Sequence, residues 1–198
     1  MGRTIRYPAP SGQSGRVNFE LTAIDGVFVV SSVANNDLRG SFARIHARQE
    51  FVERGLEQVT EQCSLSHNLR RGTIRGLHYQ LPPHAEAKLV CCVSGSVFDA
   101  VVDLRRSSPT FGRAVWFSLS AQVPAMVYVP KGCAHGFQTL EDDTSMLYMI
   151  SAPYDAASAR GIRWDDPALS IPWPLRENLV LSQRDSALPL LAETPAEF

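Results

Sequence analysis

The chain has 198 residues, of which 44% are hydrophobic and 20% charged, and its formal net charge is −1 at pH 7. This length suits one domain with a buried core, and the balanced charge excludes a general electrostatic affinity for nucleic acid or an anionic membrane. No apolar run is long enough to span a bilayer, and the first residues lack the apolar segment of a signal peptide. We expect a flexible arm over residues 1–18 and a single soluble domain over residues 19–198.

The first part of the chain predicts a strand pair, a turn and one helix. Residues 21–33 read as two strands around an Asp-Gly turn, and residues 35–37 mark a second turn. Residues 43–55 predict a helix, which Gly55 can close. The apolar residues at helical spacing in this segment and just after it are Ile45, Val52 and Leu56.

From residue 59 onward the pattern is β almost throughout. Short apolar stretches recur about every ten residues with Pro, Gly and Asp between them, which is typical of a sandwich or barrel. Residues 87–93 and 96–104 are expected to pair as a hairpin, and the segment after residue 154 is expected to wrap the barrel. The predicted strands are residues 73–80, 87–93, 96–104, 114–119, 125–129, 136–140 and 145–150.

Residues 75–88 are unusually polar for a β region. A strand that carries arginine and histidine either lines a polar cavity or is an edge strand with solvated charges, and both interpretations stay open. Side chains alternate between the two faces of a strand. This alternation places Arg75, Leu77 and Tyr79 on one face and Gly76, His78 and Gln80 on the other.

The histidines do not have the spacing of a metal-binding cupin barrel, in which two histidines lie one residue apart. The second histidine ligand is missing after His78. His78, His84, Glu86 and His135 could together supply metal ligands, but their spacing does not specify the geometry of a site. We therefore expect a barrel without a metal.

Two further side chains are candidates for chemistry. Asp99 lies in the middle of a strand and needs a cation or histidine as partner if it faces inward, whereas Asp103 suits a turn cap before Arg105. Tyr148 is either a core tyrosine or a proton donor. A histidine, a lysine, an arginine and a phenol together can form and reprotonate an enolate. Such chemistry needs no cofactor, and the chain has no glycine-rich nucleotide motif.

The four cysteines predict the compartment. Two of them are adjacent and no CxxC pair exists, as expected of free thiols in a reducing environment. We therefore expect a cytoplasmic protein. The cysteines are Cys63, Cys91, Cys92 and Cys133.

Several motifs in one order resemble a known family, that of dTDP-4-dehydrorhamnose 3,5-epimerase, from about residue 20 to residue 190. The resemblance implies an all-β, metal-free cupin jelly roll and a homodimer. It also implies epimerisation, at C3 and/or C5, of a nucleotide-linked 4-keto-6-deoxyhexose for deoxysugar synthesis. The motifs are Arg75-Gly76-Leu77-His78-Tyr79-Gln80, Lys88-Leu89-Val90, Val97-Phe98-Asp99, Asp103-Leu104-Arg105, Ser108-Pro109-Thr110-Phe111-Gly112, Pro130-Lys131-Gly132-Cys133-Ala134-His135-Gly136-Phe137 and Arg163-Trp164-Asp165-Asp166-Pro167.

The resemblance also implies roles for single residues. His78 matches the general base, Asp185 its carboxylate partner, Lys88 the cation near the enolate oxygen and Tyr148 the general acid. The residues matched to substrate binding are Arg75, Gln80 and Arg39 near the diphosphate, of which Arg39 resembles an arginine that reaches a neighbouring subunit's site, together with Phe42 and the polar pair His135 and Asp99.

The chain also departs from the family pattern. A common glutamate is Arg44, a common Gln-x-Asn pair falls at Cys63 and Leu65, and a common lysine is Met149. The nucleotide base therefore stays open. Two alternatives to the epimerase also stay open: a sugar-nucleotide 3,4-ketoisomerase on a similar barrel, and a nucleotide-sugar-binding barrel without catalysis.

Overall fold

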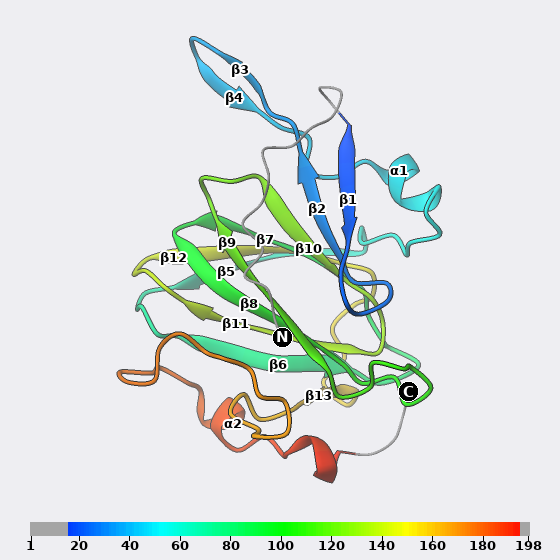
Figure 1. The fold of residues 1–198 in the computed structure, drawn as a ribbon, viewed down its shortest axis with the longest axis vertical. Helices are drawn as coiled ribbons and strands as arrows, with labels where there is room; N and C mark the ends of the chain where they lie inside the picture. Colours follow the sequence, from blue (N-terminus) through cyan, green and yellow to red (C-terminus); the bar gives the residue numbers. More distant parts are fainter. Residues whose placement is uncertain (1–15, 195–198) are drawn as a thin grey trace.

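The computed structural model describes residues 16–194, which form two antiparallel β-sheets packed face to face (Figure 1). The fold is an all-β jelly roll of the cupin type, so the expected fold class is confirmed. One sheet has six strands, in the order β1 (Val17–Leu21), β2 (Phe28–Ser32), β10 (Ala125–Val129), β7 (Lys88–Ser94), β12 (Thr144–Ile150) and β5 (Gln62–Asn68). The other has five, in the order β13 (Ala159–Gly161), β6 (Ile74–Gln80), β11 (Cys133–Thr139), β8 (Ser96–Asp103) and β9 (Ala114–Ser120).

The remaining elements are short. Strands β3 (Asn35–Asp37) and β4 (Gly40–Phe42) form a hairpin that projects from the body (Figure 1). The helices are α1 (Arg48–Val52), α2 (Gln183–Ser186) and a 3-10 turn, η1 (Leu191–Glu193). None of the helices in the described residues is long and apolar enough to cross a membrane.

The alternation of side chains on β10 shows how the core is built. Val127 and Val129 point between the sheets, where they join the main hydrophobic cluster. Met126 and Tyr128 point to the opposite face, which α1 covers through Phe51, whose ring lies 5.9 Å from that of Tyr128. All five residues of β10 are buried, because both faces of this strand are covered.

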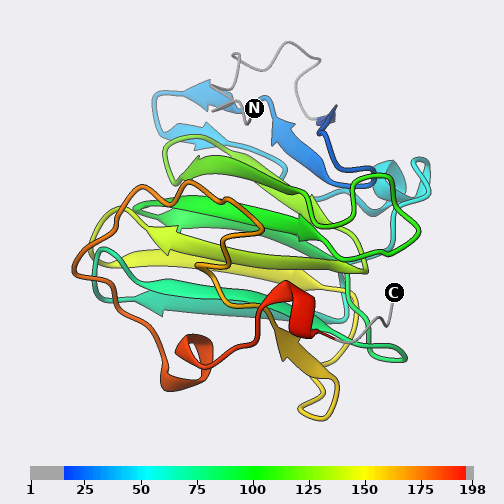
Figure 2. The same cartoon turned by 60° about the horizontal axis from the view of Figure 1, so that its bottom comes forward.

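The C-terminal segment closes the outer face of the five-stranded sheet. Figure 2 shows this segment, coloured orange to red, running across that sheet. Ile162 and Trp173 pack there against Leu77 of β6. The segment also carries α2, and with it Asp185, against the middle of β6, where Asp185 bonds Gly76 and His78.

Two expectations for the N-terminal half need correction. The predicted helix over residues 43–55 is reduced to the five residues of α1, although Gly55 does follow it with a φ of 67°. Its buried anchor is Phe51, whereas Val52 is 54% exposed, so the spacing of apolar residues pointed to the wrong face. Residues 35–37 form β3 and not a turn. Of the expected arm, residues 1–15 lie outside the described residues, and Val17 begins β1.

The expected hairpin of residues 87–93 and 96–104 is wrong. Strand β7 pairs with β10 and β12 in one sheet, and β8 pairs with β9 and β11 in the other. The chain crosses between the sheets at Gly95, which has a φ of 73°. A tight glycine turn allows either connection, so the local sequence does not distinguish a hairpin from a crossover.

Candidate active site

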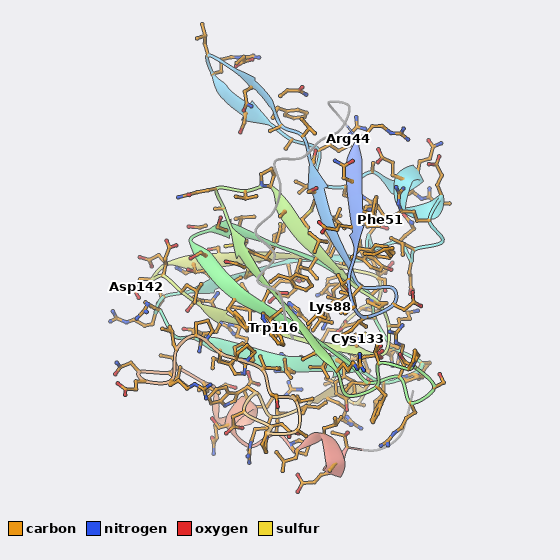
Figure 3. The ribbon with its side chains drawn as sticks, in the orientation of Figure 1. Arg44, Phe51, Lys88, Trp116, Cys133 and Asp142 are labelled. Atoms are coloured by element: carbon orange, nitrogen blue, oxygen red, sulfur yellow. The ribbon has the colours of Figure 1, made fainter. Side chains whose placement is uncertain are left out.

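A cavity of about 460 Å³ lies between the two sheets, and both contribute polar side chains to it. The five-stranded sheet supplies Arg75, His78 and His135, and the six-stranded sheet supplies Lys88 and Tyr148. Strand β6 lies between β13 and β11, so the alternative of a solvated edge strand is wrong. Figure 3 shows Lys88 inside the barrel and Arg44 outside it.

A β-bulge determines which side chains of β6 reach the cavity. His78 pairs with His135 and Arg75 pairs with Phe137, so two residues of β6 lie opposite the single residue Gly136. An extra residue breaks the alternation of side chains. Arg75 therefore lines the cavity with His78, and the expectation that it shares a face with Leu77 is wrong.

Glycine is required on both strands at this bulge. Gly76 has a φ of 134°, and a Cβ built on it would lie 2.5 Å from the Cα of Gly136. A Cβ on Gly136 would lie 2.8 Å from the carbonyl oxygen of Arg75. In the sequence, the close approach of β6 and β11 is indicated by one glycine in each of two motifs, Gly76 in residues 75–80 and Gly136 in residues 130–137.

His78 and Asp185 form a hydrogen-bonded pair at one side of the cavity. The imidazole Nε2 lies 2.8 Å from the carboxylate Oδ1, and the His78 side chain is 37% exposed. Burial raises the pKa of Asp185, but hydrogen bonds with His78, the backbone of Gly76 and Ser182 lower it more, so that the pKa lies below its ordinary value. The carboxylate thus stays ionised at neutral pH, and it orients the imidazole while the other ring nitrogen remains for proton transfer.

His135 and Asp99 form a second, deeper pair. Nε2 of His135 lies 2.7 Å from Oδ2 of Asp99, and the two side chains are 3% and 0% exposed. Asp99 therefore has the histidine partner that an inward carboxylate requires. The ring of His135 also contacts the ring of Tyr148 edge to face, with 5.9 Å between centroids.

Tyr148 projects into the cavity from β12, in the sheet opposite His78. Removal of water raises the pKa of Tyr148, and the negative charge of Asp99 raises it further, while Arg75 opposes the rise. The hydroxyl is therefore protonated at neutral pH and can act as a donor. Tyr148 thus lines the cavity and also packs against the main hydrophobic cluster.

Lys88 is almost fully buried beside His78. Its ammonium lies 2.9 Å from Oε1 of Glu86 and donates to the backbone carbonyl of His78 at 3.3 Å.

In the described part of the chain no three His, Cys, Asp or Glu side chains converge as metal ligands. Glu86 is paired with Lys88, and His84 hydrogen-bonds to Ser158.

Gln80 lines the cavity, but its side-chain amide forms hydrogen bonds to the backbone of two loops. Its amide nitrogen donates to the carbonyls of His84 and Pro153 at 2.9 and 3.2 Å, and its oxygen accepts from the N–H of Asp155 at 2.7 Å. Both N–H groups are thus in use, while a diphosphate offers only acceptors. The geometry does not support the expected contact of Gln80 with a diphosphate.

Arg39 and Phe42 lie outside the cavity of their own chain. They belong to the projecting β3–β4 hairpin, where the Arg39 side chain is 90% exposed and bonds to Asp37. Phe42 is 75% exposed.

Sequence reasoning missed several residues of the cavity wall. Arg184 adjoins Asp185, so position along the chain could have indicated it, whereas Glu86 was considered only as a metal ligand and not as a partner of Lys88. Arg160 lies on β13, whose three residues are too short for any periodic pattern. Together with Arg75, these arginines make the cavity strongly cationic.

The family model described as dTDP-4-dehydrorhamnose 3,5-epimerase matches residues 21–193. The chain is 41% identical over 180 residues to the Sinorhizobium fredii dTDP-4-dehydrorhamnose 3,5-epimerase, covering 91% of this chain and 92% of that protein. It is 39% identical over 171 residues to the dTDP-4-dehydrorhamnose 3-epimerase of Streptomyces niveus, covering 86% and 82% of the two chains.

Solved structures agree over the whole fold. The Legionella pneumophila dTDP-6-deoxy-D-glucose-3,5-epimerase in complex with dTDP-4-keto-L-rhamnose superposes with a TM-score of 0.86 at 35% identity, covering 92% of this chain and 96% of that one. A 3′-monoepimerase from Streptomyces bikiniensis in complex with dTDP-quinovose gives a TM-score of 0.81 at 32% identity, covering 86% of each chain.

Proposed function

The chain belongs to the dTDP-4-dehydrorhamnose 3,5-epimerase family, and we propose that its cavity inverts C3, or C3 and C5, of a nucleotide-linked 4-keto-6-deoxyhexose. As a member of this family it is an isomerase of the epimerase class. The observation that carries the proposal is that the His78–Asp185 pair and Tyr148 line one cavity from opposite sheets.

The proposed reaction begins with His78 as base. Its free ring nitrogen takes the proton from the carbon beside the 4-keto group, and the C–H electron pair forms the enolate double bond as the carbonyl π pair moves to oxygen. Lys88 stabilises this oxygen with its ammonium. Tyr148 then donates its proton to the carbon from the opposite face as the carbonyl re-forms, which inverts the centre.

The cationic lining supports a substrate with a diphosphate. Arg75, Arg160 and Arg184 all line the cavity. Guanidinium groups match phosphate oxygens in bidentate geometry, whereas a neutral sugar alone would not need three of them. Binding measured across a panel of nucleotides would identify the nucleobase of the substrate, because Arg44, Cys63 and Leu65 depart from the family pattern.

The proposed assembly is a homodimer. The exposed hairpin β3–β4 projects away from the body of its own chain, which supports a role in which Arg39 and Phe42 reach the cavity of a second copy (Figure 1). Apolar residues on β5 and β7 are also exposed, Leu65 by 64% and Val93 by 47%, and a second copy would cover them. A monomeric mass in solution with full activity would contradict this assembly.

We place the enzyme in the cytoplasm. The four cysteines are free thiols, which supports a reducing compartment. Cell fractionation tests this placement, and recovery in an oxidising compartment would contradict it.

The deciding experiment is incubation with dTDP-4-keto-6-deoxyglucose in deuterated water, followed by NMR at C3 and C5. Deuterium with inverted product at C3 alone identifies a 3-epimerase, and at both carbons a 3,5-epimerase. A product in which the carbonyl has moved to C3 would identify the ketoisomerase instead. Binding without label or inversion at either carbon would identify a barrel without catalysis.

A further inference from the structure

Glu86 is a charged residue of the cavity that the proposed mechanism leaves without a role. Its side chain is 10% exposed and that of Lys88 is 9% exposed, so the pair is largely removed from solvent. Carboxylates are rarely buried without a specific partner. This carboxylate lies against the ammonium assigned to the enolate oxygen.

The local chain brings the two side chains together. Glu86 and Lys88 are two residues apart where the chain enters β7, and in extended backbone such residues share a face. Ala85 and Ala87, which alternate with them, are buried on the other side. The pair therefore faces the cavity from one wall.

The contacts of Lys88 show what Glu86 does for it. The ammonium has three N–H groups, of which one donates to Glu86 at 2.9 Å and one to the His78 carbonyl at 3.3 Å. Among the described residues the third N–H has no protein acceptor, and the side chain lines the cavity. A lysine side chain has several freely rotating bonds, and two fixed acceptors hold it in a single orientation.

We propose that Glu86 is a positioning residue that aims the ammonium of Lys88 at the enolate oxygen. The inference rests on the proposed function, because an enolate oxygen is the group that Lys88 would meet. Donors that are oriented before the reaction stabilise developing charge most effectively. Glu86 would therefore affect the rate of proton abstraction more than substrate affinity.

A double-mutant cycle between Glu86 and Lys88 tests the proposal. Glu86→Gln keeps the shape and an acceptor but removes the charge, and we expect kcat to fall about 10-fold to 100-fold with KM changed less than about threefold. Lys88→Met leaves the Glu86 carboxylate unpaired beside the forming enolate. In that background Glu86→Gln should raise kcat, because it removes the like charge.

The opposite signs distinguish positioning from a structural role. If Glu86 only stabilised the fold, Glu86→Gln would lower activity in both backgrounds, and that result would overturn the proposal. A rise in KM with unchanged kcat would assign Glu86 to substrate binding and also overturn it. Circular dichroism of each variant checks folding.

Glu57→Gln is the matched control. It alters another Glu–Lys pair, with Lys131 at 2.6 Å and with side chains 38% and 46% exposed, whose residues do not line the cavity. We expect less than a twofold change in kcat for this variant. If the wild-type enzyme exchanges deuterium but Glu86→Gln matches it, the positioning role alone fails; if the wild type shows no exchange, the proposed function itself fails.

Discussion

His78 and His135 are paired in register across β6 and β11, and each imidazole bonds its own carboxylate, Asp185 or Asp99. The two pairs differ in depth. The His78 side chain is 37% exposed, and that of His135 is 3% exposed. Only His78 is accessible enough to receive a proton from a sugar, so the two histidines should respond differently to mutation.

His78→Asn should abolish solvent exchange while leaving binding intact. The amide cannot accept the proton, and general-base catalysis typically contributes about 10²-fold to 10⁴-fold, so we expect kcat to fall about 10³-fold. Titration calorimetry with dTDP should give a Kd within about threefold of the wild type. Near-normal turnover would remove His78 from the role of base.

His135→Ala should act on stability. It leaves the fully buried Asp99 carboxylate without its partner, and Oδ1 of Asp99 already has no hydrogen-bond partner among the described residues. Breaking a buried pair in this way costs about 3–5 kcal/mol. Urea unfolding measures the loss, which should be much smaller in His78→Asn; equal losses would contradict the difference in depth.

Arg75→Ala should weaken binding before it affects chemistry. Its guanidinium lines the cavity and donates to Asn68 at 2.7 Å, which fixes its orientation in the cavity wall. We expect Kd for dTDP to rise about 10-fold to 100-fold, consistent with about 1.5–3 kcal/mol for a charged hydrogen bond. Arg113→Ala, an exposed arginine outside the cavity wall, is the control; an equal effect would point to general charge and not to a specific contact.

Gly76→Ala should disrupt the bulge. The new Cβ would meet the Cα of Gly136 at 2.5 Å, in a backbone conformation that side chains rarely adopt. We expect the free energy of unfolding to fall by about 3 kcal/mol or more. Gly40→Ala is the matched control, because its φ of 128° is similar but nothing lies within 4 Å of its Cβ. If both variants lose the same stability, backbone strain and not close packing explains the glycine.

Part of this architecture could be predicted from the sequence. Prolines and glycines punctuate the strands, so their ranges from residue 73 to residue 150 agree with the structure to within a few residues. Strand partners could not be predicted in the same way, because Gly95 suits either a hairpin or a crossover. The bulge at Gly76 shifted Arg75 to the cavity face, against the simple alternation of a strand.

The candidate site depended on contacts between distant parts of the chain. His78 and Asp185 are 107 residues apart, and spacing carries no information about such a pair. The resemblance to a family supplied this pairing, and it did not supply Glu86. Only the folded chain places that carboxylate against Lys88.

The network around Asp103 predicts a loss of stability in acid. Asp103 is fully buried and accepts from Arg105, Ser108 and Thr110, as a turn cap. Burial raises its pKa, but these hydrogen bonds lower it more, from 3.8 to about 2. The carboxylate therefore stabilises the fold fully above pH 4, and this stabilisation is lost as the pH falls through 2.

The shift corresponds to about 2 kcal/mol, so the wild type should lose about that much more stability than Asp103→Asn between pH 4 and pH 2. Asp165→Asn is the control, because Asp165 pairs with Arg163 at the same spacing but at the surface, where such pairs contribute less than about 1 kcal/mol. Urea unfolding at several pH values measures both. Parallel curves for wild type and Asp103→Asn would contradict the prediction.

Tyr148→Phe should separate exchange from inversion. Inversion requires a proton to leave one face of the sugar and another to arrive on the opposite face, and Tyr148 stands on the sheet opposite His78. Without the hydroxyl, His78 can still remove a proton and return deuterium on its own face. Exchange into unreacted substrate should therefore stay within about 10-fold of the wild type, while inverted product falls about 10²-fold or more.

The control is Tyr128→Phe, because Tyr128 is a buried tyrosine whose hydroxyl bonds to the backbone of Glu57 outside the cavity. Burial raises the pKa of Tyr128 to about 12, so this residue too is protonated at neutral pH, and the two variants differ in position and not in charge. Tyr128→Phe should lose some stability and keep inversion. NMR of the label and of the product separates the two activities in one sample. Inversion at the native rate in Tyr148→Phe would assign the proton donor to another group, and equal loss of exchange and inversion would show that the hydroxyl acts before the proton is returned.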